Sequence, residues 1–198
     1  MNAFTATATV AEKLFKDLVA QTEAHIKRDG GLPPHFMIYT SEGRLLVIEP
    51  VRLDDATKPL VYAAVRCACI AHGASVIAFL HEIWCLSVDP GLRIPDLRPS
   101  QSERRVEAAF VSCCWLEAAE RRHLFSCREI IRNAAGGVAG LARELFEDKD
   151  IDVGGVLSEL LPASPSAQAT RQRAQRDLDQ MCRLGIIEVQ EPDSMTSN

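Results

Sequence analysis

The sequence lacks the features that would assign a function directly. It has no CxxC or HExxH spacing for zinc and no GxSxG segment for a nucleophilic serine. No apolar run reaches the eighteen or so residues that a membrane-spanning helix needs. The N-terminal segment MNAFTATATVAEKLF has neither the basic start nor the continuous apolar core of a signal peptide. We therefore expect a cytoplasmic chain that does not contact membranes.

Net positive charge and a disulfide framework are absent as well. The formal net charge of -5 argues against nucleic-acid binding by the surface as a whole, although it leaves a local basic patch open. The seven cysteines are odd in number, and most of them lie inside apolar runs. Such cysteines behave as small buried hydrophobic residues, so we expect free thiols and a reducing compartment.

Residues 1–133 predict an α+β core domain. An amphipathic helix starts at a capping box formed by Thr9 and Glu12 and ends before Gly30. A second helix starts near Asp54 and runs to about His72, where Gly73 ends it. Five further segments are rich in strand-forming residues: 35–39, 45–48, 75–88, 106–115 and 123–131. The short links favour an antiparallel or mixed five-stranded sheet with the helices on one face.

Residues 134–189 predict a small helical extension. Helices are expected at 138–146, at 156–161 and from the Ser164-Pro165 pair to Leu184, followed by a short strand at 186–189. Residues 190–198 are expected to be a disordered tail. The composition, with 47% apolar and 25% charged residues, is ordinary for a globular protein of this size.

Three segments carry a resemblance to known sequences. They are PHFMIYTSEGRLLVIEP, AHGASVIAFLHEIWCLS and PSQSERRVEAAFVSC, which together span roughly residues 33–114. They resemble an uncharacterised group of small proteins from bacterial and phage genomes. The resemblance implies the same α+β core and a possible association with phage or mobile elements, and it implies no activity.

The segment ATRQRAQRDLDQMCRLGIIEV, residues 169–189, resembles the recognition helix and wing of winged-helix domains. In that arrangement Arg171, Arg173, Arg176 and Arg183 contact DNA phosphates. The helices expected at 138–146 and 156–161 would complete a three-helix unit. The alternative is an amphipathic helix that packs on the core and leaves its arginines in solvent.

A glycine run follows the last strand of the predicted core. Gly136, Gly137 and Gly140 would open a helix after a strand, which is the context in which backbone amides bind phosphate. The run loosely resembles the coenzyme A loop of GNAT acetyltransferases, which implies a small transferase. Glycines in such a run also serve simply to turn the chain.

Two patterns suggest metal ligands. His81 and Cys85 share one strand face, as do His123 and Cys127, so adjacent strands would bring mixed nitrogen and sulfur ligands together. Asp148, Asp150, Asp152 and Glu159 follow the spacing of a calcium loop, but Val153 stands where that loop needs glycine. Buried cysteines and a solvated acidic loop are the simpler interpretations, so we predict no metal and no cofactor.

The sequence therefore favours a non-enzymatic binding or regulatory module with an unknown protein partner. A DNA-binding regulator that uses the C-terminal helical unit is the first alternative. A small transferase that uses the glycine loop is the second. The sequence leaves the oligomeric state open.

Overall fold

The computed structural model describes residues 3–86, 102–103, 105–118, 120–145, 156–164 and 166–192. Its strands form one antiparallel sheet in the order β6-β5-β4-β3-β1-β2-β7. The helices are α1 (Ala3–Asp29), α2 (Lys58–His72), α3 (Val156–Leu160) and α4 (Gln168–Arg183). The strands are β1 (His35–Thr40), β2 (Leu45–Pro50), β3 (Ala74–Leu86), β4 (Arg105–Glu117), β5 (Glu120–Arg132), β6 (Val138–Glu144) and β7 (Ile187–Gln190). The predicted α+β class is confirmed, with seven strands instead of five.

Strand β3 occupies the centre of the sheet. Its residues 76–80 are all buried, because both faces of a central strand are covered. Val76, Ala78 and Leu80 belong to one hydrophobic cluster, while Ile77 and Phe79 belong to another. Successive side chains of a strand point to opposite faces, so the two clusters lie on opposite faces of the sheet.

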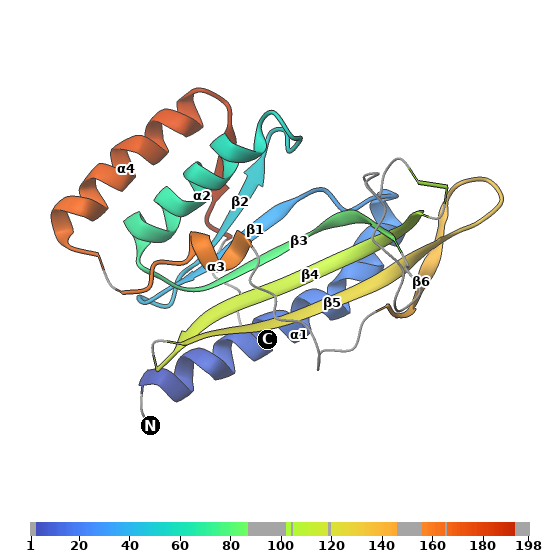
Figure 1. The fold of residues 1–198 in the computed structure, drawn as a ribbon, viewed down its shortest axis with the longest axis horizontal. Helices are drawn as coiled ribbons and strands as arrows, with labels where there is room; N and C mark the ends of the chain where they lie inside the picture. The colour runs from blue at the N-terminus through green and yellow to red at the C-terminus, as the bar shows by residue number, and fades with distance from the viewer. Residues whose placement is uncertain are drawn as a thin grey trace.

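Helix α1 covers the face that carries Val76, Ala78 and Leu80. Its fully buried residues Ala11 and Ile26 lie on the same stripe as Leu18, at the spacing of an amphipathic helix. Figure 1 shows α1 passing behind β4 and β5. The helix begins at Ala3, not at the predicted capping box, because the Ala-Thr repeat before Thr9 contains no helix breaker and alanine favours helix.

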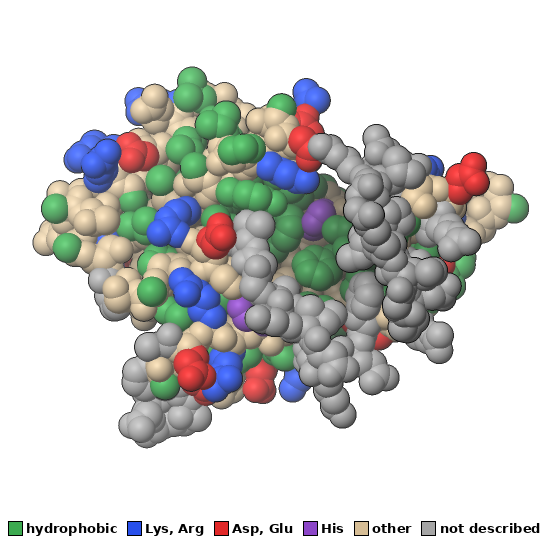
Figure 2. Space-filling view, viewed as in Figure 1, with side chains coloured by type: hydrophobic (Ala, Val, Ile, Leu, Met, Phe, Trp, Pro, Cys, Tyr) green, Lys and Arg blue, Asp and Glu red, His purple; other side chains and the backbone are tan. Residues whose placement is uncertain are grey.

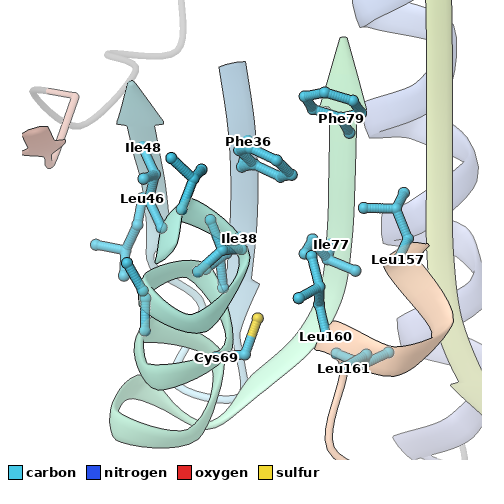
Figure 3. Close-up of a cluster of buried hydrophobic side chains, with 14 of the residues drawn as sticks. Phe36, Ile38, Leu46, Ile48, Cys69, Ile77, Phe79, Leu157, Leu160 and Leu161 are labelled. Carbon is cyan, nitrogen blue, oxygen red and sulfur yellow. The ribbon is translucent and has the colours of Figure 1, made fainter. Parts of the chain in front are cut away.

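The remaining helices lie on the other face, so helices contact both faces and not one as predicted. Both faces of β3 and β4 are apolar, and each therefore needs cover. Helix α2 packs on the β1–β2 hairpin, and Leu157, Leu160 and Leu161 lie on the same side of the sheet as Ile77 (Figure 3). Helix α4 packs on α2, with Leu178 buried between them. None of the described helices is long and apolar enough to cross a membrane.

The chain after residue 133 supplies both edge strands of the described sheet. Residues 138–144 form β6 beside β5, so the predicted helix at 138–146 is wrong. The turn at 133–137 explains the difference, because it folds the chain back as a hairpin and offers β5 as a pairing partner. The predicted last strand is confirmed as β7, which pairs with β2. Residues 193–198 of the predicted tail lie outside the described residues.

Candidate functional site

A pocket of about 450 Å³ lies at the end of the sheet where α2 ends and α4 begins. Its walls come from six parts of the chain: Thr7, Ser41, Cys69, Ile70, Gly73, Ala74, Ser75, Leu116, Ala118, Pro162, Ala163, Ser164, Ser166 and Arg171. Small-molecule sites have this size, and they combine mainly apolar walls with a few polar groups. We therefore take this pocket as the candidate functional site.

Among the described residues that line the pocket, Arg171 has the only cationic side chain. It lies in the first turn of α4, where its backbone N–H donates to the carbonyl of Ala167 at 3.0 Å. Its side-chain Nε is buried and has no hydrogen-bond partner among the described residues. Arg132 shows the contrast, because its Nε and Nη2 each donate to a carboxylate oxygen of Glu107 at 2.6 Å. Arg171 thus lines the pocket, and its Nε has no hydrogen-bond partner among the described residues.

Gly73 makes room for the guanidinium of Arg171. A Cβ at this position would lie 3.1 Å from Nη2 of Arg171 and 3.1 Å from Oγ of Ser41. Gly73 also ends α2 with a φ of 61°, in the left-handed region that favours glycine. The backbone N–H of Ser41 donates to its carbonyl at 2.9 Å. The ends of β1 and α2 and the start of α4 therefore meet at this residue.

The other polar groups of the pocket are neutral. The hydroxyl of Ser75 donates to the carbonyl of Tyr39 at 3.1 Å, which leaves its own lone pairs able to accept. Ser41, Ser164 and Ser166 add further hydroxyls. Burial raises the pKa of the Cys69 thiol, so this group stays protonated. The pocket therefore combines one positive charge with uncharged hydroxyls and apolar walls.

The four arginines predicted to contact DNA do not share one surface role. Arg171 lines the pocket, whereas Arg173 is exposed and lies 4.0 Å from Asp177. Arg176 is exposed, and Nε of Arg183 donates to a backbone carbonyl within α4 at 3.3 Å. The predicted three-helix unit is not formed by the described residues, because 138–144 is a strand at the far edge of the sheet.

The glycines predicted to bind a cofactor lie in and after a hairpin turn. Oδ1 of Asn133 accepts from the backbone N–H groups of Ala135 and Gly137, each at 3.0 Å. Gly136 has a φ of 83°, which this tight turn requires. Gly140 lies within β6. The predicted strand-to-helix context is wrong for this segment, because a strand follows the turn.

The two histidines predicted as metal ligands contact other groups instead of each other. His81 lies between Phe79 and Phe110, with ring centroids 4.4 and 6.4 Å away. Nε2 of His123 lies 3.0 Å from Oγ of Ser158, where the hydrogen bond ties α3 to β5. The described residues contain no group of three or more histidine, cysteine or acidic side chains placed to hold a metal.

Two of the residues predicted as metal ligands contact each other, whereas most of the predicted calcium ligands lie outside the described residues. Sγ of Cys85 lies 3.8 Å from Sγ of Cys127. Asp148, Asp150 and Asp152 of the calcium pattern lie outside the described residues, as does most of the proline-rich loop at 89–102. Glu159 is exposed on α3, and its carbonyl accepts from Arg66.

Sequence reasoning missed the pocket, although it predicted several of the segments that form it. Gly73 was predicted as the end of a helix and Arg171 as part of a basic helix, but neither pattern indicates that they meet. An arginine in the first turn of a helix is unusual, because cationic side chains are stabilising near the last turn instead. This position of Arg171 is the signal that could have marked it as a functional residue. Comparisons with protein-family models, curated proteins and solved structures found no match to this chain.

Proposed function

We propose that this chain is a non-enzymatic binding module whose pocket takes a small molecule with an apolar body and one anionic group. The observation that carries the proposal is Arg171, which lines a pocket with apolar walls and whose buried Nε has no hydrogen-bond partner among the described residues. The anionic group would bind the guanidinium. The apolar body would lie against Ile70, Leu116 and Pro162.

The energetics favour an anion over a neutral ligand. A hydrogen bond that involves a charged group contributes about 1.5–3 kcal/mol, more than one between neutral groups. A carboxylate also matches the planar guanidinium, because it accepts two parallel hydrogen bonds that are stronger than neutral ones. Burial of apolar ligand surface adds about 25 cal/mol per Å². A carboxylate on a short hydrocarbon chain or ring combines both contributions.

Thermal unfolding with a matched ligand series tests the proposal. The series pairs linear carboxylates of four to twelve carbons, numbers chosen for a pocket of about 450 Å³, with alcohols of the same length. We expect the carboxylates to raise the melting temperature and the alcohols to have a much smaller effect. A ligand at 100 times its Kd stabilises the folded state by about 2.7 kcal/mol, which is readily measured.

Two arginine variants control the experiment. Arg171→Met keeps most of the side-chain volume and removes the charge, so it should abolish the preference for carboxylates. Arg176→Met changes an exposed arginine of the same helix and should bind like the wild type. Equal stabilisation by alcohols and carboxylates, or unchanged carboxylate binding by Arg171→Met, would contradict the proposal.

DNA binding by α4 is a second candidate function, favoured by the exposure of Arg173, Arg176 and Arg183. The measurement is binding of a labelled duplex between 50 and 200 mM salt, a range over which phosphate contacts weaken steeply. Arg173→Ala should lower the salt dependence by about one counterion if this arginine contacts a phosphate. Binding that is undetectable or insensitive to salt would exclude this candidate.

A further inference from the structure

Two polar side chains of the pocket approach each other over Gly73, which has no side chain of its own. Ser41 lies in the turn directly after β1, and Arg171 lies in the first turn of α4. Both of them line the pocket, as does Gly73. A residue from the β1–β2 turn and a residue from α4 therefore meet at the end of α2, although they are far apart in the sequence.

The distances around Gly73 place both side chains within reach of one ligand group. Oγ of Ser41 and Nη2 of Arg171 each lie 3.1 Å from the position that a Cβ of Gly73 would take, so these two atoms are at most twice this distance apart. A carboxylate oxygen accepts from a cationic N–H at about 2.7–2.9 Å and from a hydroxyl at about 2.5–2.7 Å. One carboxylate can therefore span the two donors, because each of its oxygens can take one of them.

No described group competes with a ligand for these two side chains. Among the described residues, the hydroxyl of Ser41 has no hydrogen-bond partner and Arg171 has no ion-pair partner. Other cationic side chains lie beside acidic ones, as Arg44 does with Glu42 and Glu191, and Figure 2 shows such neighbours on one face of the molecule. The described residues that line the pocket include no aspartate or glutamate. The described wall therefore carries one positive charge and no negative charge.

We propose that Ser41 is the second donor of this pocket, and that the ligand is a monoanionic carboxylate whose two oxygens accept from Arg171 and Ser41. This inference rests on the proposed function and specifies the anionic group. A phosphate monoester carries about 1.5 to 2 negative charges at neutral pH. Its second charge would have no cationic partner in the described wall, and burying an unpaired charge is costly. The pocket therefore favours a carboxylate over a phosphate.

The backbone of Ser41 is held in place by contacts within the protein. Its N–H donates to the carbonyl of Gly73 at 2.9 Å. In the same turn, the N–H of Thr40 donates to the carbonyl of Arg44 at 2.9 Å, and the N–H of Gly43 donates to the carbonyl of Thr40 at 3.0 Å. A ligand therefore needs to order only the side-chain torsions of Ser41, which keeps the entropic cost of binding small.

The test is calorimetric titration of the full-length protein with octanoate, octyl phosphate and octanol. We expect octanoate to bind most tightly. Ser41→Ala should raise the Kd of octanoate about tenfold, because it removes a hydrogen bond to a charged group, and it should leave the Kd of octanol unchanged. Ser41→Thr is the matched variant, because it keeps the hydroxyl at the same position and should retain the affinity for octanoate.

Arg171→Met separates this inference from the proposed function on which it rests. Ser41 is exposed, so Ser41→Ala should fold, and far-ultraviolet circular dichroism of each variant checks this before the titration. A wild type that does not bind octanoate would contradict the proposed function and this inference together. Octanoate binding that Arg171→Met loses and Ser41→Ala retains in full would overturn the role of Ser41 alone. Tighter binding of octyl phosphate than of octanoate would overturn the assignment of a carboxylate.

Discussion

At the scale of the residue, His81 is a neutral histidine enclosed by aromatic rings. Burial lowers its pKa to about 4, while the unfolded chain has a value near 6.5. The fold therefore favours the neutral ring. The stability contributed by the neutral ring of His81 is complete above pH 6.5, and it is lost as the pH falls from 6.5 toward 4.

We expect the free energy of unfolding to fall by roughly 3 kcal/mol between pH 7 and pH 4 because of this residue, at about 1.4 kcal/mol for each pKa unit. Urea unfolding at a series of pH values measures the fall. His81→Phe keeps an aromatic ring beside Phe79 and removes the titrating group, so the difference between the two proteins isolates the histidine. Identical pH profiles would show that His81 is charged at little cost in the fold.

Gly73 combines a backbone requirement with a steric one. Gly73→Ala places a side chain in the left-handed region, which costs about 1–2 kcal/mol, and presses its Cβ against Arg171 and Ser41. Gly185→Ala is a matched control, because Gly185 has a φ of 66° and open space around its Cβ. We expect both variants to lose stability in urea unfolding, and Gly73→Ala to lose more because of these contacts. Only Gly73→Ala should also weaken carboxylate binding. Equal carboxylate binding by the two variants would show that Gly73 does not contribute to the site.

At the scale of the element, α3 is a five-residue helix held by its contacts with the rest of the chain. Leu157, Leu160 and the following Leu161 belong to the same buried hydrophobic cluster as the apolar side of α2. The side chain of Arg121 donates to the carbonyl of Leu161 at 3.3 Å. A helix this short has no stability of its own in water. Its position, and that of the pocket residues 162–164 after it, therefore depends on these leucines.

Leu160→Ala should lower the free energy of unfolding by about 2–4 kcal/mol, because it leaves a cavity under α3. Leu184→Ala removes the same atoms from a residue that is 67% exposed, and it should change stability by less than about 0.5 kcal/mol. Chemical denaturation of the two variants gives the comparison. Similar losses in both would mean that α3 is not anchored by its leucines.

At the scale of the whole molecule, the sequence predicted the elements whose partners are near in the chain. The hairpins 35–48 and 106–131 have clear strand periodicity and turn residues, and the mostly apolar character of β3 correctly indicated a central strand. Segment 138–144 was predicted as a helix because Val-Ala-Gly-Leu-Ala-Arg-Glu contains helix-favouring residues. Tertiary pairing with β5 overrides that preference. The pocket could not be predicted, since it joins residues as distant as Ser41 and Arg171.

The sheet order predicts how the protein unfolds. The segment after residue 133 was expected to form a separate extension, but β6 and β7 pair with strands at opposite sides of the described sheet. We therefore expect a single cooperative transition, with equal calorimetric and van't Hoff enthalpies. Differential scanning calorimetry makes the measurement. Two separate transitions would support independent units instead.

The pairing of β2 with β7 also has a consequence for synthesis of the chain on the ribosome. Residues 45–50 leave the ribosome long before residues 187–190, so β2 remains an open sheet edge while most of the protein is being made. An unpaired edge is a template for strands of other chains, and newly made proteins are most prone to aggregation at this stage. Strand β7, which emerges after all the other described strands, is therefore the one that closes this edge.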